Sequence, residues 1–138
     1  MTYRPVRFDD YEKMRALWDR SPGVGLSSAD EPEPIRRYLE HNPGLSLLAV
    51  DGERVVGTIL AGHDGRRGYL HHLAVDESYR RAGIGRELVR LALDALAAEG
   101  IAKCHLFMFR KNRLGARFWR ALSWVRRNDI VVYSRDLA

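Results

Sequence analysis

The sequence lacks several features that would assign it to particular classes of protein. Its 138 residues include one cysteine, Cys104, so no disulfide can form within the chain, and this suits a cytoplasmic protein. No apolar run approaches the roughly 20 residues that a membrane-spanning helix needs. No apolar stretch follows the first charged residues, as it would in a secretory signal. Without repeats or low-complexity segments, we expect one globular domain over residues 1–138, located in the cytoplasm.

Charge is distributed unevenly along a chain of otherwise ordinary globular composition. Residues 1–64 carry 8 Lys or Arg against 11 Asp or Glu, a net charge of −3. Residues 65–138 carry 15 against 7, a net charge of +8. A positive half favours a polyanionic partner such as a nucleotide cofactor, nucleic acid or phospholipid. Since 20 of the 23 basic residues are arginine, codon bias is an equally good explanation, and charge alone decides nothing.

Hydrophobic periodicity predicts an α/β (α+β) domain with the element order βααβββαβαβ. Tight-turn signals at residues 51–52 and 63–65 predict a meander of antiparallel strands between them. Helices interspersed with these strands are expected on both faces of a mixed, mostly antiparallel central sheet. The expected strands are Thr2–Arg7, Leu45–Val50, Arg54–Ala61, Gly68–Val75, Ala102–Phe109 and Ile130–Ser134. Four helices are expected. One begins after Asp9 or Asp10, one begins at Pro32, and the other two cover Gly83–Glu99 and Asn112–Leu122.

The segment RRAGIGR, residues 80–86, indicates a functional site because it joins an apolar strand to a long amphipathic helix. Gly83 and Gly85 permit a close backbone approach and positive φ angles. The helix start offers unpaired N–H groups and the positive end of the helix dipole. Three arginines add charge that suits phosphate oxygens. This pattern predicts a site for a pyrophosphate.

Two other kinds of phosphate loop fit this segment poorly. A Walker A loop needs Gly-Lys-Ser/Thr, which is absent. The dinucleotide fingerprint needs a third glycine where this chain has Leu88, and an acidic ribose partner that Cys104–Phe109 does not offer.

The sequence resembles the GNAT superfamily of acyl-CoA-dependent N-acetyltransferases over nearly its whole length. The family signature R/Q-x-x-G-x-G/A is matched by Arg80, Gly83 and Gly85, after the preceding Leu-Ala-Val-Asp. A second family motif, N-x-x-A-x-x-F/L-Y-x-x-x-G-F, is echoed in degraded form by residues 112–124.

The resemblance implies an enzyme that moves an acetyl group from acetyl-CoA to a primary amine, by direct attack in a ternary complex. In the family, loop amides matching residues 81–86 hold the CoA pyrophosphate. Main-chain groups matching Leu73 and Val75 pair with the pantetheine arm, and the side chain matching Asn112 faces the cofactor. The cofactor-binding candidates are Leu73, Ala74, Val75, Arg80, Arg81, Ala82, Gly83, Ile84, Gly85, Arg86, Asn112, Phe118 and Trp119.

Acyl transfer to an amine needs a base, because an alkylammonium with a pKa of about 10.4 is almost fully protonated at neutral pH. Tyr69 and His71 are expected on one face of their strand, with Leu70 and His72 on the other. In animal arylalkylamine acetyltransferases, which this stretch resembles, two histidines occupy the positions of Tyr69 and His71. We therefore expect His71 to act as general base, directly or through water, with Tyr69 assisting. A purely structural hydrogen bond by His71 is the alternative.

Two positions depart from the family pattern. Trp119 stands where most relatives place the tyrosine that protonates the leaving thiolate, and an indole N–H cannot realistically transfer its proton. Tyr133 on the last expected strand could substitute, water could protonate the thiolate, or the enzyme could be slow. Ser123 replaces a family glycine, which puts the turn after the last helix in doubt.

The acceptor and other partners remain open in the sequence. A small amine, an amino acid, an antibiotic or a protein N-terminus would each serve, and Asp30, Glu31 and Glu33 could attract a cation. A catalytically weak acyl-CoA-binding module is the main alternative function. A nucleic-acid binder is a distant third; it would use Arg110, Arg113, Arg117, Arg120, Arg126 and Arg127, of which Arg113, Arg117 and Arg120 share one helical face. No metal site is expected, and Trp124 and Tyr133 are candidates for the seam of a homodimer, which is common in the family.

Overall fold

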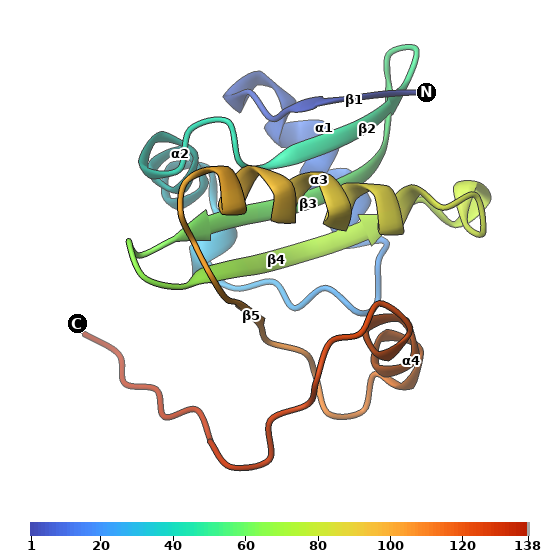
Figure 1. The fold of residues 1–138 in the computed structure, drawn as a ribbon. Coiled ribbons are helices and arrows are strands. Elements are labelled where there is room, and N and C mark those ends of the chain that lie inside the picture. The colour runs from blue at the N-terminus through green and yellow to red at the C-terminus, as the bar shows by residue number, and fades with distance from the viewer. Residues whose placement is uncertain (138) are drawn as a thin grey trace.

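A computed structural model describes residues 1–137 and contains one five-stranded sheet whose strands follow the order of the sequence (Figure 1). The first four strands pair antiparallel, and the fifth pairs parallel to the fourth. The mixed, mostly antiparallel sheet that the sequence predicts is confirmed. Its strands are β1 (Thr2–Pro5), β2 (Leu47–Asp51), β3 (Arg54–His63), β4 (Gly68–Val75) and β5 (Cys104–Leu106).

The helices lie close to the positions predicted from periodicity and turn signals. Pro32 and Pro34 occupy the first turn of α2, where a missing N–H costs nothing. Asp10 precedes α1 but does not cap it, because its carboxylate accepts hydrogen bonds from the Arg4 guanidinium and the Arg7 backbone N–H. The helices are α1 (Tyr11–Asp19), α2 (Pro32–His41), α3 (Ile84–Ala98) and α4 (Arg113–Ala121), with single 3-10 turns η1 (Phe8–Asp10), η2 (Ser28–Asp30) and η3 (Glu77–Tyr79).

Two hydrophobic clusters cover the two faces of the sheet. On one face, α3 buries its apolar stripe against alternate side chains of β2 and β3. Gly57 of β3 has no side chain there, and a Cβ atom would lie 3.1 Å from the side chains of both Ile84 and Leu88. On the other face, α1 and α2 pack against the remaining side chains of β2, β3 and β4. Helices therefore lie on both faces, as predicted.

The β4–β5 ladder is short and leaves one edge of β4 free. Backbone pairing runs from Gly68 opposite Cys104 to Leu70 opposite Leu106 and goes no further. β4 nevertheless continues to Val75, still paired with β3 on its other side. The two strands therefore separate beyond Leu70, and β5 is shorter than the predicted range of residues 102–109.

The chain after α4 differs from prediction. The strand expected over Ile130–Ser134 does not form, and residues 125–137 are exposed and carry no regular secondary structure. A strand sequence alone cannot make a strand, because each ladder needs a neighbour that supplies hydrogen bonds. The turn after α4 does form, since Ser123 takes a φ of 71° and the Trp124 N–H donates to the Trp119 carbonyl at 3.0 Å.

None of the helices in residues 1–137 is both long and apolar enough to cross a membrane.

Candidate functional site

The loop before α3 presents a row of free hydrogen-bond donors. Six consecutive backbone N–H groups, those of residues 81–86, have no acceptor within the described chain. Arg81 and Gly83 both have positive φ angles, 66° and 80°, and left-handed residues of this kind are typical of anion-binding turns. A run of free N–H groups at a helix start is suited to an anion. The loop therefore keeps the free donors on which the predicted pyrophosphate site depends, and the site itself stays a prediction.

The side chains of the loop leave that row accessible. Arg81 and Arg86 are exposed and form no ion pair within residues 1–137, so both can approach a phosphate. Ile84 is buried in the core, and it can reach a ligand only through its N–H group. Gly85 lies under the ring of Phe118 from α4, which an added Cβ would approach to 3.4 Å.

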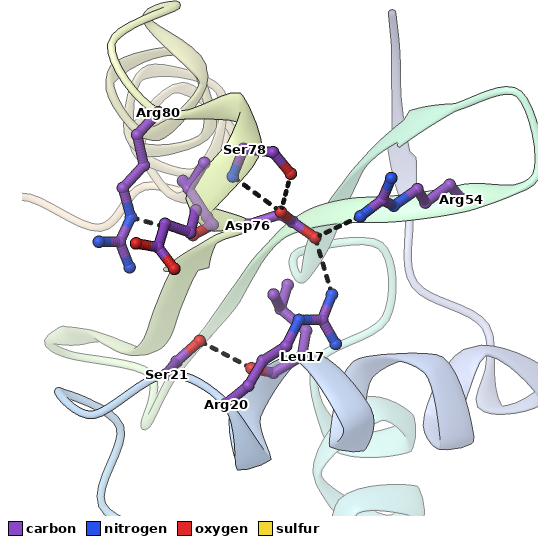
Figure 2. A pocket seen from close by; sticks show the side chains of 9 residues that line it. Leu17, Arg20, Ser21, Arg54, Asp76, Ser78 and Arg80 are labelled. Carbon is purple, nitrogen blue, oxygen red and sulfur yellow. Dashed lines mark hydrogen bonds and ion pairs between the residues drawn. The ribbon is translucent and has the colours of Figure 1, made fainter.

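A buried carboxylate anchors the start of this loop (Figure 2). Asp76, at the end of β4, is 4% exposed and accepts hydrogen bonds from the backbone N–H and the hydroxyl of Ser78. The guanidinium groups of Arg20 and Arg54 reach its other oxygen at 2.8 and 3.1 Å. The Ser78 hydrogen bond, followed by the Arg20 guanidinium, holds the pKa of Asp76 well below its usual value. Asp76 thus ties β4 and η3 to α1 and β3.

The pocket drawn in Figure 2 lies around this carboxylate and extends to Arg80. Its volume is about 340 Å³. The Arg80 Nε donates weakly to the Val75 carbonyl at 3.4 Å, so this signature arginine is aimed partly at the backbone of its own loop. The ion pairs of Asp76 with Arg20 and Arg54 form part of its wall.

A ligand held at the loop can continue along the free edge of β4. The Asp76 N–H donates to the Val56 carbonyl of β3 at 2.8 Å. Because successive backbone groups of a strand point to opposite sides, those of Val75 and Leu73 point away from β3. Ala74 is 5% exposed and turns its side chain into the core. Leu73 and Val75 therefore have backbone groups on the open side of β4, where the Val75 carbonyl already accepts the weak hydrogen bond from Arg80.

A cleft of about 320 Å³ opens where β4 and β5 separate. His71, Leu73, Asn112 and Trp119, all predicted site residues, line it together. The other lining residues come from the loop after α1, from β4 and from the segment after β5; they are Gly23, Val24, Gly25, His72, Phe107, Met108 and Phe109.

His71 is the titratable group in the cleft that is available to a substrate. Its imidazole makes no hydrogen bond within the described residues, and it lies edge-on to the Tyr38 ring with centroids 6.1 Å apart. Burial, followed by the charge of His72, lowers the pKa of His71 below its usual value of 6.5, with Asp30 opposing the shift. A neutral imidazole without an internal partner can accept a proton near neutral pH. Tyr69 stacks on His71 in nearly parallel fashion, with centroids 6.5 Å apart.

His72 lies on the same face of the sheet as His71, which corrects the prediction from strand alternation. The β3–β4 register shifts between Thr58 and Leu60, and His72 takes a φ of 51° at this bulge. An extra residue in one strand reverses the alternation of side chains. His72 consequently packs against Trp18 of α1, and its Nε2 lies 2.6 Å from the Asp30 carboxylate.

The remaining predicted residues are placed as follows. Asn112 caps α4, since its Oδ1 accepts from the Gly115 N–H at 2.8 Å. Trp119 and Phe118 pack edge to face on α4. Ala82 is exposed in the loop before α3. Tyr133 is 92% exposed, outside the cleft and on no strand, so the prediction that a last strand carries it is wrong.

Two walls of the cleft were not predicted from the sequence. The ring of Phe109 lies against Gly25, where an added Cβ would come within 2.5 Å of it, so the glycines after α1 make room for the aromatic wall. The glycines of SPGVG, residues 21–25, were a usable signal of a close approach, but only the fold shows which residue approaches them.

No carboxylate lines the cleft: Asp30 is buried against His72, and Glu31 and Glu33 are exposed on the α2 side.

Neither a metal site nor a reactive thiol stands beside this cleft. Burial raises the pKa of the Cys104 thiol to about 11, which keeps it protonated. Within residues 1–137, no group of three His, Cys, Asp or Glu side chains is placed to hold a metal ion.

Comparison with known proteins gives concordant results. Residues 11–124 match the sequence model of the Acetyltransferase (GNAT) family. Acetyltransferase SG1711 of Sodalis glossinidius is 32% identical over 138 residues, covering 99% of this chain and 96% of that protein. The fold is similar to that of the apo aminoglycoside 6'-N-acetyltransferase AAC(6')-IG of Acinetobacter haemolyticus, with a TM-score of 0.79, 18% identity and full coverage of both chains. A predicted acetyltransferase of Clostridium acetobutylicum, solved with acetyl-CoA, gives 0.77 at 14% identity over 96% of this chain and 95% of that one.

Proposed function

The chain belongs to the GNAT family of acetyl-CoA-dependent acetyltransferases, and from this premise we propose that it acetylates a primary amine by direct attack in a ternary complex. The donor is acetyl-CoA, as the resemblance implied. Membership in a family of acetyltransferases favours an enzyme over a binding module without catalysis. The nucleic-acid hypothesis has no supporting observation beyond the arginines of α4.

The observation that carries the proposal is that three features adjoin one another: the free N–H groups before α3, the open edge of β4, and the cleft. The free N–H groups of residues 81–86 would hold the pyrophosphate, and the open edge of β4 leads from them to the cleft. Along that edge, the backbone groups of Val75 and Leu73 would pair with the pantetheine amides. The acetyl thioester would then lie at the cleft, where His71 is. Asn112, Phe118 and Trp119 would border the cofactor from α4.

His71 is proposed to remove the proton that the amine must lose. At neutral pH, roughly one part in 10³ to 10⁴ of an alkylamine is unprotonated, a deficit of about 4–5 kcal/mol. The lowered pKa of His71 keeps its imidazole neutral and able to accept this proton, directly or through water. As the nitrogen bonds to the acetyl carbon, the carbon–sulfur bond breaks and the proton passes through His71 to solvent. Tyr69 would support the His71 ring by stacking.

The leaving thiolate is proposed to take its proton from water. A thiol with a pKa of about 8.5 is a tolerable leaving group even without an acid. Trp119 lies in the cleft but its N–H is not acidic, and Tyr133 lies outside the cleft. No tyrosine lines the cleft in the described part of the chain.

The lining of the cleft favours an acceptor with an apolar body and one positive charge. Val24, Phe107 and Phe109 supply an apolar and aromatic surface, and no carboxylate is present to match a polycation. The fold neighbour from Acinetobacter haemolyticus is an aminoglycoside acetyltransferase. This cleft instead suits an amine attached to an apolar or aromatic group, for which cation–π contact is available.

Calorimetric titration with acetyl-CoA tests the cofactor site first. We expect micromolar binding by the wild type, which Arg81→Glu and Gly83→Val abolish, because the first reverses a charge and the second strains the positive φ. Arg66→Glu, at an exposed arginine in the turn between β3 and β4, is the matched charge control and should bind like the wild type. Absence of binding by the folded wild type would sink the proposal.

Detection of free thiol with a panel of amines then tests the acceptor. Aromatic and apolar monoamines should be acetylated faster than aminoglycosides at equal concentration. The reverse order would refute the assigned acceptor class and leave the cofactor site standing.

A further inference from the structure

A second imidazole stands beside the proposed base and has no part in the steps described above. The bulge in β4 places His72 on the same face of the sheet as His71, and both residues line the cleft. His72 takes a φ of 51°, a left-handed conformation that is costly for a residue other than glycine and that tends to be kept at functional sites. Because the two imidazoles are neighbours, a proton on one disfavours a proton on the other.

Buried side chains of β3 and α1 hold His72 in this conformation. The His72 carbonyl accepts a hydrogen bond from the Thr58 hydroxyl at 2.9 Å, and that hydroxyl accepts one from the Trp18 indole N–H at 3.0 Å. Both Thr58 and Trp18 are buried. The His72 ring lies edge-on to the Trp18 ring, with centroids 4.8 Å apart. The backbone and the ring of His72 are therefore both fixed by the core.

Asp30, the last residue of η2, meets the far side of the His72 ring. One carboxylate oxygen lies 2.6 Å from the His72 Nε2, and the other accepts the Ser27 backbone N–H at 2.9 Å. The Asp30 side chain is 7% exposed, and within residues 1–137 its carboxylate forms an ion pair with His72 alone. The nearby Arg15 guanidinium instead donates to the Asp30 backbone carbonyl and pairs with Asp19. Because a buried carboxylate is costly without a compensating cation, His72 is the group placed to supply the positive charge.

We propose that Asp30 decides which of the two imidazoles carries a proton at neutral pH. His72 carries the proton in a buried ion pair with Asp30, and His71 stays neutral and free to accept one from the substrate. Two neighbouring imidazoles with different surroundings thereby take different roles. Asp30 acts through His72 and is a positioning residue. This role rests on the proposed function of His71 as base only in its consequence for the rate.

The other groups near the pair do not change charge in the range where imidazoles titrate. Those that face His71, Asp30 or the stacked tyrosine are Tyr11 and Arg15 of α1, Tyr38 of α2, Tyr69 of β4 and, against Tyr69, His105 of β5. Phenols ionise near pH 10 and guanidinium groups above pH 12, and His105 contacts Tyr69 but neither imidazole of the pair. Burial, followed by the charge of His72, lowers the pKa of His71, and the charge of Asp30 opposes this shift. Asp30 and His72 therefore act on His71 with opposite signs.

Nitrogen NMR of the imidazole rings in the isotope-labelled wild type tests the proposal directly. At neutral pH, both ring nitrogens of His72 should give the signals of an imidazolium, and those of His71 should give the signals of a neutral ring. A neutral His72 or a protonated His71 at this pH overturns the proposal. The measurement needs neither activity nor a variant, so it decides even if the variants below fail to fold.

The variant Asp30→Asn should move the titration of His71 in a definite direction. The amide keeps the shape of the side chain and an oxygen for the Ser27 N–H, but it cannot compensate a charge on His72. His72 should then be neutral at neutral pH, and the titration midpoint of His71 should rise by about half a pH unit once that neighbouring charge is lost. If Asp30 acted on His71 only through its own negative charge, the midpoint would fall. A midpoint that falls or does not move overturns the proposal.

A matched control and a rate measurement complete the test. Glu31→Gln removes a carboxylate from the next residue, which is exposed and does not cap α2 with its side chain, and it should leave both imidazoles as in the wild type. In Asp30→Asn, the acid limb of kcat/KM should move to higher pH together with the NMR midpoint of His71, which a purely structural defect would not cause. An NMR shift without a kinetic shift would confirm the role of Asp30 and refute His71 as the base.

Discussion

Two helices of this protein show how differently its two parts are built. Both α3 and α4 have an apolar stripe, but five residues of α3 are buried and none of α4 is. The contrast extends to the whole chain. All of the buried residues fall within residues 1–100, the packed part, whereas residues 101–137, the open part, contain none.

The difference follows from what each helix has to pack against. α3 lies across a sheet face made by β2, β3 and β4, whose alternate side chains complement its stripe. α4 follows β5, a strand of only three residues, and so meets little sheet surface. An apolar pattern therefore specifies a face to be covered, but not whether the same chain covers it. The loop of residues 80–86 belongs to the packed part, and the cleft lies between the two parts.

The largest expected contrast is catalytic and compares one cleft residue from each part. His71→Gln, in the packed part, should lower kcat/KM by about 10² to 10⁴-fold, because it removes the base. Trp119→Phe, in the open part, should cost far less, since its indole N–H transfers no proton. Steady-state rates with saturating acetyl-CoA measure both. A loss at Trp119→Phe as large as that at His71→Gln would break the assignment.

The pH profile sharpens that comparison. With rates corrected for the protonated fraction of the amine, kcat/KM of the wild type should fall as the pH drops below the lowered pKa of His71, which lies under 6.5. The direction follows because a protonated imidazole cannot accept a proton. His71→Gln should lack this acid limb, and Trp119→Phe should retain it.

Core packing gives the next largest contrast. Leu88→Ala in α3 should reduce the free energy of unfolding by about 2–5 kcal/mol, because Leu88 is completely buried. Leu114→Ala in α4, at a residue that is 69% exposed, should change it by no more than about 0.5 kcal/mol. Urea denaturation of the two variants provides the comparison. Equal losses would show that α4 is covered in solution to the same degree as α3.

Two carboxylates that pair with arginine, one buried in the packed part and one exposed in the open part, should also differ in their effect on stability. Asp76→Asn should cost about 1–3 kcal/mol at neutral pH, since Asp76 is buried and its oxygens satisfy four donors. Asp129→Asn, where the carboxylate is 66% exposed and pairs with Arg127, should make no measurable difference. Denaturation at a series of pH values measures both.

The pH dependence of the Asp76 effect has a definite sign. The pKa of Asp76 is lowered on folding, so its stabilisation is fully present above the unfolded value of about 3.9 and is lost as the pH falls toward the folded value. The gap between wild type and Asp76→Asn should therefore stay constant down to about pH 4 and narrow below it. A gap that narrows between pH 7 and pH 5 would contradict the assignment.

The smallest contrast concerns two left-handed backbone positions. Ser123→Gly in the open part should stabilise the protein by about 1 kcal/mol, because a side chain at φ 71° is strained. Gly83→Ala in the packed part should destabilise it by a similar amount, since Gly83 has φ 80° and no atom lies within 4 Å of an added Cβ. Opposite shifts in thermal midpoint are expected. Shifts of the same sign would show that one of these angles is not kept in solution.

Much of the fold was predictable because local chemistry marked it. Asp51-Gly52 and the prolines of α2 bound their elements, and the amphipathic run of α3 needed only a period of 3.6 residues. The loop of residues 80–86, with its glycines followed by a helix start, was predictable as a local feature, and its role as an anion site stays a prediction. The absent last strand was not, because Ile130–Ser134 carries every local sign of a strand and lacks only a neighbour.

The cleft was predictable only in part. Strand alternation placed Tyr69 and His71 together, but it put His72 on the wrong face because a bulge leaves no clear mark in a sequence. The pairing of His72 with Asp30 joins residues 42 positions apart, and Phe109 meets Gly25 from still farther along the chain. No local pattern contains contacts of that range.

The sequence by itself determined most of the element types and the family, and it predicted an anion site in residues 80–86, because these depend on spacing over a few neighbouring residues. Only the tertiary structure decided which side chains share the cleft, which carboxylate anchors the loop, and which part of the chain has no sheet face to pack against. Those outcomes depend on the separation of β4 and β5 and on the bulge at His72, and both arise from how the strands pair in space.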